Sequence, residues 1–407
     1  MRRLFAIPAF ARLWVAAFFS ETAEWMLQVA LPVYLFASTG SAVTTALSIV
    51  LGLLPAVLLS PVAGVVADRR NRRVVLALVC GGQAVVVLPL LAGDGLPVAV
   101  IYLVMAAQAG LASVFEPARN ALVPELVGVG EVTAANGLMS VVGSVARLAG
   151  GWAGGVLLGW GGLGRVVAGY LAALAVAGVV LAAPLRGRAP RSPTAARRTE
   201  WLAGFRELGS ERLRVPSVST LLTSIAQGMF LVLFVVFVLD LLSGSEADAG
   251  LLRGVQAIGG LVAGLALTAV ARRVAPAALQ GWGLLAMGVV SAVIWNLPGL
   301  TTALGVYVGL FMLVGAPGVV AGAGLLAHVQ AVTSADRAGR VLSTTFALMA
   351  AGNAAGSLLA GALVSVTGPG VLLNAQAGIH AVAGLLVLGW AKGRFRRSPR
   401  AEVVTVG

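Results

Sequence analysis

The sequence predicts an all-α integral membrane protein, built from twelve transmembrane helices in two pseudo-symmetric bundles of six. The first observation behind this is composition: 59% of the 407 residues are hydrophobic, only 11% are charged, and the mean hydropathy is +0.98. A soluble domain carries about 25% charged residues. The second is a series of twelve apolar stretches, and the third is the way in which basic residues alternate between the links that join them.

Each of the twelve stretches is close to the roughly 20 residues that a helix needs to cross the hydrocarbon core. They lie at about 11–37, 43–66, 74–93, 97–115, 133–160, 164–185, 216–241, 248–271, 278–297, 302–326, 341–366 and 371–390. Residues that favour turns stand between several of them, as at Thr39-Gly40-Ser41 and Gly368-Pro369-Gly370.

The basic residues give the stretches an orientation. Of the 28 Lys and Arg residues, 25 fall in the two termini and in every second link, which places these segments in the cytoplasm. The net charge of +13 is therefore a sign of topology, and no nucleic-acid partner is expected. Arginine is used 27 times and lysine once, which favours a GC-rich bacterial source. We expect a monomer in the bacterial inner (plasma) membrane with both termini cytoplasmic.

The domain organisation follows from the longest link. We expect an N-terminal bundle at 1–185, a cytoplasmic linker with an amphipathic helix at 186–215, a C-terminal bundle at 216–391 and a basic tail at 392–407. Arg147-Leu-Ala-Gly150 in the fifth stretch is similar to Asn353-Ala-Ala-Gly356 in the eleventh, which indicates a duplication. The glycines of Ala149–Gly155 predict close helix packing.

Ionisable residues inside a membrane are costly, so each is a functional candidate. Glu21 and Glu24 lie one turn apart in the first stretch, and Arg147 reaches a similar depth in the fifth. Low dielectric and mutual repulsion predict that one carboxylate is protonated, which favours proton coupling. A permanent ion pair with Arg147 and direct substrate contact are the alternatives. Asp240 and Arg253 flank one outer link and are expected to pair as an outer gate, or else to be solvated.

The link after the second stretch carries the most specific motif. Gly64, Asp68, Arg69, Arg72 and Arg73 match the Gly-x-x-x-Asp-Arg-x-Gly-Arg-Arg loop of the major facilitator superfamily, with Asn71 in place of the second glycine. The chain thus resembles that superfamily, and the resemblance implies that Asp68 latches the cytoplasmic side. It also implies a central cavity lined by the first, fourth, seventh and tenth helices. The expected cavity residues, to which Asn353 is added, are Trp25, Gln28, Gln108, Phe115, Gln227 and Phe230.

Further motifs resemble the branch of enterobactin exporters and macrolide-efflux proteins. They include Leu13-Trp14, Phe115-x-Pro117-Ala-Arg119 and Gly339-Arg340-Val341. This resemblance implies proton-driven efflux, by alternating access, of a bulky amphipathic molecule such as a drug, macrolide, siderophore or secondary metabolite. An importer of the same fold and a non-transporting sensor or scaffold are the alternatives. No enzyme, cofactor or metal site is expected, because the chain has two His, one Cys and no phosphate-binding loop.

Overall fold

The computed structural model describes residues 2–69, 72–93, 95–128, 131–182, 207–270, 274–333 and 335–397, and these contain helices and no strands. The helices before the central linker are α1 (Arg2–Phe5), α2 (Pro8–Thr39), α3 (Ala42–Arg69), α4 (Arg72–Val87), η1 (Leu88–Ala92), α5 (Val98–Val127) and α6 (Val132–Ala182). Those after it are α8 (Arg214–Val236), the π-helical η4 (Phe237–Leu241), α9 (Glu246–Val270), α10 (Pro276–Asn296), η6 (Leu297–Gly299), α11 (Leu304–Val332), α12 (Ala335–Thr367) and α13 (Pro369–Arg397).

These helices account for the twelve expected spans. Gly161 and Gly162 leave the helical conformation within α6, at the boundary expected between the fifth and sixth spans. By length and composition, nine helices among the described residues can cross a membrane, with α6 counted once; the first part of α3, Ala42–Pro55, is a shorter apolar helix outside the nine. The polar residues Glu21, Glu24 and Gln28 lower the hydropathy of α2, which is not among the nine. The chain is therefore a multi-pass membrane protein.

The predicted boundaries were too short at several ends. Helix α5 continues through Pro117 and Pro124 to Val127, although the hydrophobic stretch ends near residue 115. Polar and charged residues at these ends are helical without being apolar, so hydropathy does not detect them. The turn glycines Gly40, Gly93 and Gly368 all have positive φ, as their places between spans predict.

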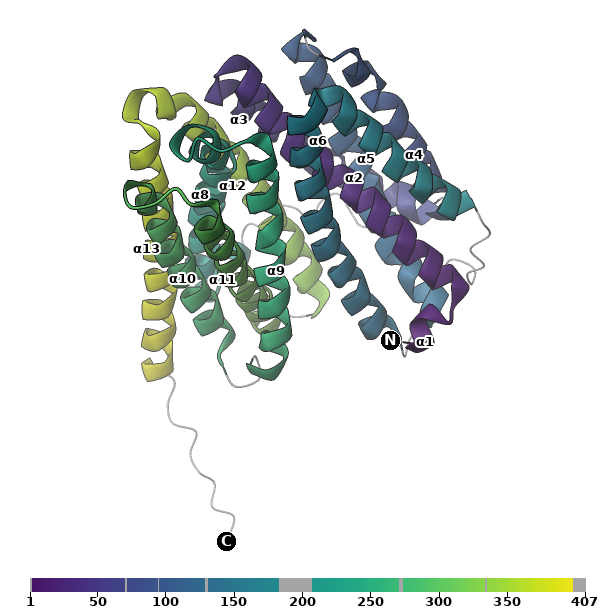
Figure 1. Cartoon of the computed structure of the whole chain (residues 1–407). Helices are drawn as coiled ribbons and strands as arrows, with labels where there is room; N and C mark the ends of the chain where they lie inside the picture. Colours follow the sequence, from purple (N-terminus) through teal and green to yellow (C-terminus); the bar gives the residue numbers. More distant parts are fainter. Residues whose placement is uncertain are drawn as a thin grey trace.

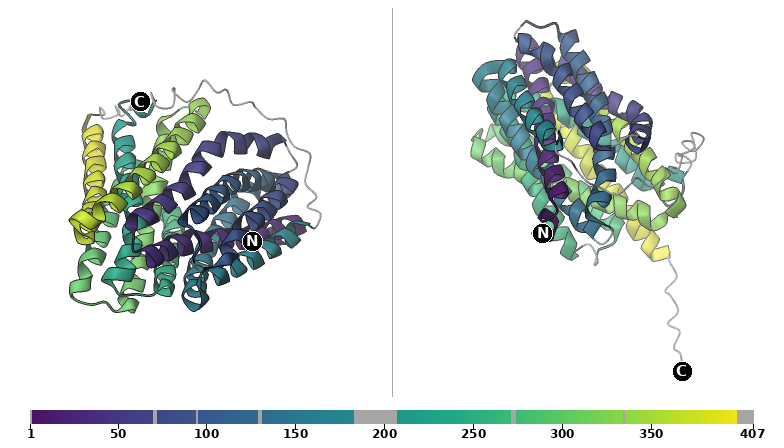
Figure 2. Two further views of the ribbon diagram at one scale, coloured as in Figure 1. Left: turned by 90° about the horizontal axis from the view of Figure 1, so that it is seen from above. Right: turned by 90° about the vertical axis from the view of Figure 1, so that its right-hand side faces the viewer.

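Figures 1 and 2 show the N-terminal helices, in purple to blue, gathered beside the C-terminal helices in green to yellow. Within the first bundle α2 packs on α6, and α3 and α4 pack on α5. Within the second, α8 packs on α12 and α13, and α10 packs on α11 and α13. Helix α1 and the end of α13 lie at the same end of the molecule (Figure 1).

The two bundles meet through two helix pairs, α6 with α9 and α3 with α12. In the first pair, a Cβ atom on Gly155 would lie 2.5 Å from the carbonyl oxygen of Glu246 and 2.8 Å from the Cα of Gly250. In the second pair, a Cβ on Gly361 would lie 2.7 Å from the Cβ of Ala46. Both contacts lie near the end that carries the turns at Gly40, Gly162 and Gly368, so the halves close on each other at this end.

A second face of α6 packs within its own bundle. A Cβ on Gly150 would lie 2.4 Å from the carbonyl oxygen of Thr22, and a Cβ on Gly356 of α12 would lie 1.9 Å from that of Ile225 in α8. Because Gly150 and Gly356 make the same contact, α2 corresponds to α8 and α6 to α12, as the expected duplication requires. Glu24 follows Thr22 by two residues, as Gln227 follows Ile225, so these two positions correspond. Arg147 precedes Gly150 by three residues, as Asn353 precedes Gly356, so they correspond as well.

Gly155→Ala should push α6 away from α9, because the added methyl group meets backbone atoms that cannot rotate aside. We expect a cost of about 1–3 kcal/mol, as for other overpacked sites. Spin labels at Ser38 and Thr367, which are exposed at the closed end, should report a longer distance between the bundles. The labels can be attached after the single cysteine, Cys80, is replaced by alanine.

Gly178→Ala is the matched control on the same helix, since nothing lies within 4 Å of its added methyl group. Equal label distances in Gly155→Ala and Gly178→Ala would show that the α6–α9 contact does not hold this end closed.

Candidate functional site

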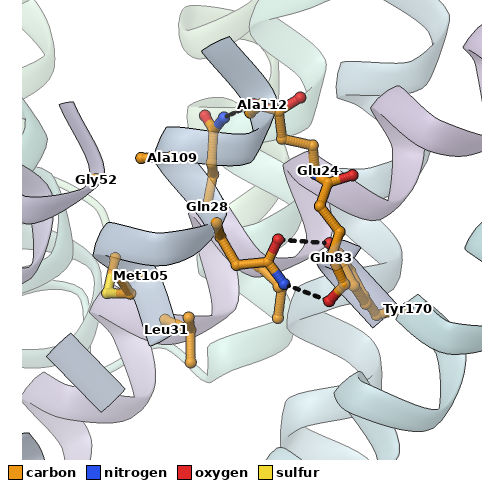
Figure 3. Close-up of a pocket in the computed structure, with 11 residues that line it drawn as sticks. Glu24, Gln28, Leu31, Gly52, Gln83, Met105, Ala109, Ala112 and Tyr170 are labelled. Carbon is orange, nitrogen blue, oxygen red and sulfur yellow. Dashed lines mark hydrogen bonds between the residues drawn. The ribbon is translucent and has the colours of Figure 1, made fainter. Parts of the chain in front are cut away.

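Glu24 lines a cavity inside the N-terminal bundle (Figure 3). The amide Nε2 of Gln28 donates a hydrogen bond to Oε1 of Glu24 over 3.1 Å. The cavity, of about 60 Å³, has room for several water molecules. Its other polar lining residues are Gln83, Gln108 and Tyr170. The carboxyl group of Glu24 therefore points into a polar space within the bundle.

The polar wall of this cavity is internally bonded. Gln108 Nε2 donates to the carbonyl oxygen of Gln83 over 2.8 Å, and the hydroxyl of Tyr170 donates to Gln108 Oε1 over 3.1 Å. Sequence reasoning predicted Gln108 but missed Gln83 and Tyr170, which belong to α4 and α6. A polar side chain within an apolar stretch could have identified both residues as candidates. The resemblance, however, assigned the cavity to the first, fourth, seventh and tenth helices, which contain neither residue.

Glu21 and Glu24 are not a coupled pair. Glu21 forms an ion pair with Arg119 of α5, and both side chains are largely buried. Glu24 has no ion pair with any residue that the structure describes. The two carboxyl groups therefore differ: Glu21 is neutralised by an arginine, and Glu24 is bonded by a neutral amide.

Arg147 forms no ion pair with either acid among the described residues, so the structure does not contain the pair that was the alternative to proton coupling. Its guanidinium lies 5.5 Å from the centre of the Trp25 ring, and its Nε is buried without a hydrogen-bond partner. Consecutive residues of a helix point about 100° apart. Trp25 is one of the residues of α2 that contact α6 near Arg147, and Glu24 lines the cavity within the bundle instead.

Arg253 does not form the expected outer gate with Asp240. Asp240 is exposed in η4, and no ion pair to it occurs among the described residues. Asp248 caps the start of α9 by accepting hydrogen bonds from the backbone N–H and the hydroxyl of Ser245, each over 2.8 Å. Arg253 lies seven residues after the start of α9, about 10 Å deeper at the usual helical rise.

Arg253 instead lines a cavity of about 140 Å³ between the two bundles. Its Nη1 donates to Oε1 of Gln256 over 3.1 Å, and its guanidinium lies 5.3 Å from the centre of the Phe230 ring. The other lining residues are Trp25, Gln28, Val29, Pro32, Val33, Ile49, Gly52, Leu53, Met105, Leu231, Phe234 and Val235. Gln28, Gly52 and Met105 line the Glu24 cavity as well, so the two spaces share a wall.

The remaining expected cavity residues lie in three different places. Gln227 and Phe230 line a third cavity inside the C-terminal bundle, together with Gln256 and Gln376. Phe115 is buried in the hydrophobic core. Asn353 packs on Gly228, with its Oδ1 buried and without a hydrogen-bond partner.

Only part of the cytoplasmic motif lies within the described structure. The surroundings of Gly64 and the side chains of Asp68 and Arg69 are outside the described part of the structure, as are most of the linker and the end of the tail. Arg72 forms an ion pair with Glu125 of α5. Arg73 donates to the carbonyl oxygens of Leu181, over 2.8 Å, and Ala182. These two arginines tie the start of α4 to α5 and to the end of α6.

The sequence profile of the Major Facilitator Superfamily matches residues 13–344. No curated protein sequence matches the chain. Among solved structures, the nucleoside transporter NupG is 14% identical with a TM-score of 0.75, covering 94% of this chain and 99% of its own. A bacterial homologue of the iron transporter ferroportin in the inward-facing state is 17% identical with a TM-score of 0.72, covering 94% and 98%. Its outward-facing state has a TM-score of 0.60, at 18% identity and 94% and 99% coverage.

Glu21→Ala should destabilise the protein by about 3 kcal/mol, because it leaves the guanidinium of Arg119 buried without its carboxylate. Glu116→Ala removes a second acid near the same guanidinium, at 3.7 Å, but that carboxylate is 72% exposed and should matter by less than about 1 kcal/mol. Thermal unfolding in detergent compares the two. Equal losses would show that the Glu21–Arg119 pair does not stabilise the bundle.

Proposed function

Because the chain belongs to the major facilitator superfamily, we propose that it is a proton-coupled secondary transporter that exports a bulky amphipathic small molecule by alternating access. Membership makes the chain a transporter of small molecules, not an enzyme. Export and proton coupling are our proposal. They are supported by the motifs of the enterobactin-exporter and macrolide-efflux branch and by the surroundings of Glu24.

The proposed state of the structure is inward-facing. The bundles close at the end where, by the distribution of arginines, the links are extracellular. The higher TM-score to the inward-facing ferroportin homologue than to its outward-facing state supports this. On this proposal the protein is a monomer in a bacterial inner membrane, with both termini in the cytoplasm. The glycine contacts of α6 with α9 then form the outer gate, in place of Asp240 and Arg253.

The observation that carries proton coupling is the position of Glu24. Its carboxyl group lines a cavity with room for several water molecules and is bonded to the neutral amide of Gln28 rather than to a cation. A carboxylate deep in a membrane and without a cation is stabilised by taking up a proton. Because its cavity shares a wall with the space between the bundles, protonation and cargo binding can influence each other.

The coupling cycle follows from this arrangement. Glu24 takes up a proton when the cavity opens to the outside, and the cargo leaves on that side. Glu24 then releases the proton to the cytoplasm in the inward-facing state, which restores the site for the next cargo molecule. A proton-coupled importer would use the same residues with cargo and proton moving in the same direction. Cargo accumulation by intact cells would distinguish import from export.

The similar solved structures do not identify the cargo of this protein. A nucleoside transporter and a homologue of an iron transporter share the fold at low identity. The part of the chain that the structure describes holds no group of three or more metal-binding side chains. An organic cargo is therefore favoured, and a susceptibility panel of macrolides, siderophores and dyes in a pump-deficient bacterial strain would identify it.

Glu24→Gln should abolish export driven by a pH gradient and leave the protein folded, because glutamine has the same shape and cannot take up a proton. For each panel compound against which the wild-type protein protects, the variant should lose protection. In purified protein, the infrared carbonyl band of a protonated carboxyl group, followed across a pH jump, should lose one component.

Glu131→Gln, at the start of α6 and outside the cavities described above, is the matched control and should behave as wild type in both assays. Undiminished export by Glu24→Gln with an unchanged pH dependence would remove Glu24 from the coupling role.

A further inference from the structure

The cavity between the bundles contains a cation without a matching anion. Arg253 lines this cavity, and its guanidinium has five N–H donors. One of these is bonded to Gln256, whose own amide is held by a 3.3 Å hydrogen bond to the carbonyl oxygen of Leu252. Among the residues that the structure describes, Arg253 forms no ion pair. Several of its donors are thus left for another group.

A second guanidinium reaches the helix that carries Arg253. Arg147 comes from α6, on the opposite bundle, and its Nη2 lies 3.9 Å from the place that a Cβ atom on Gly260 of α9 would take. Its Nε is buried without a hydrogen-bond partner, and it also forms no ion pair with a described residue. The stacking on Trp25 and Phe230 offsets only part of the cost of placing two cations in a membrane.

Apart from Arg253 and Gln28, the wall is apolar. Trp25, Pro32, Leu231 and Phe234 are among the residues that line it. An inorganic anion alone would not use this surface, whereas an organic molecule with an apolar body and an anionic group would use both parts. Guanidinium groups bind carboxylates and phosphates with two parallel hydrogen bonds, which fixes the orientation of such a group.

We propose that the cargo is an amphipathic organic anion whose carboxylate or phosphate group binds Arg253, with Arg147 contributing positive charge from the opposite bundle. This inference rests on the proposed transport function. Because the two arginines belong to different bundles, a bound anion offsets their repulsion and stabilises the arrangement in which the bundles meet.

The test is equilibrium binding of matched aromatic probes to the purified full-length protein in detergent at one pH. The probes are 2-naphthoate, 2-naphthyl phosphate, 2-naphthamide and 2-naphthylmethylammonium, which share an apolar body and differ in charge. The wild-type protein should bind at least one of the two anions about tenfold tighter than the amide, and the ammonium weakest. The relative affinities of the two anions distinguish a carboxylate from a phosphate cargo.

Arg253→Gln should lower the affinity for the preferred anion to that of the amide, with the affinity for the amide unchanged. Arg253→Lys keeps the charge and should retain part of the preference, which separates loss of charge from loss of fold. Arg165→Gln is the matched control, because Arg165 also stacks on a tryptophan, 4.1 Å from the Trp160 ring centre, but is exposed at the kink of α6. It should bind all four probes as wild type does.

Equal binding of the four probes, preference for the ammonium, binding of none of them, or an anion preference that survives in Arg253→Gln would each overturn the proposal. The assay uses no pH gradient. Failure of proton coupling in the Glu24→Gln experiment would therefore leave this result unaffected, and failure of anion binding would leave the role of Glu24 unaffected.

Discussion

Close backbone contact on two neighbouring faces of α6 is the constraint on which the rest of the structure depends. Gly150 and Gly154 meet backbone atoms of α2, and Gly151 and Gly155, one residue further round the helix, meet α9. In a membrane there is little hydrophobic force between helices, so such contacts depend on packing without side chains between the backbones. The same helix therefore holds its own bundle together and joins the two bundles at one end.

This contact also decides where the polar side chains can go. With α6 pressed against α2, the Cβ of Trp25 lies against Gly150, and Arg147 lies over the Trp25 ring. Glu24, one residue earlier, is turned into the N-terminal bundle. In the C-terminal bundle the corresponding positions hold Gln227 and Asn353, which are neutral. The duplicated fold thus carries a titratable carboxyl group in only one of two equivalent cavities, as a single proton-binding site requires.

The sequence predicted the fold class and the kink of α6, because hydropathy, glycine turns and the arginine distribution each depend on local residues. The resemblance to the superfamily placed Gln28 at a cavity, where it lies. Sequence reasoning paired the wrong charges, however: Glu21 binds Arg119, and Arg253 lies in the central cavity away from Asp240. Depth along a helix can be read from residue spacing, but the face that each side chain presents depends on helix rotation and packing. Helix rotation and packing depend here on contacts between residues far apart in the sequence, such as Gly150 with Thr22.

Gln28 connects the two charged sites. It lines both cavities, and its amide N–H donates to Glu24. An ionised carboxylate can only accept a hydrogen bond, so it holds the donor side of this amide. Once protonated, the carboxyl group can donate, and the amide oxygen can then turn toward it. The N–H₂ group of Gln28 would then no longer be held by Glu24, so the groups that this amide presents to the cavity of Arg253 would change. A proton on Glu24 would in this way change the hydrogen-bonding groups that the cargo meets, without any charge moving between the two cavities.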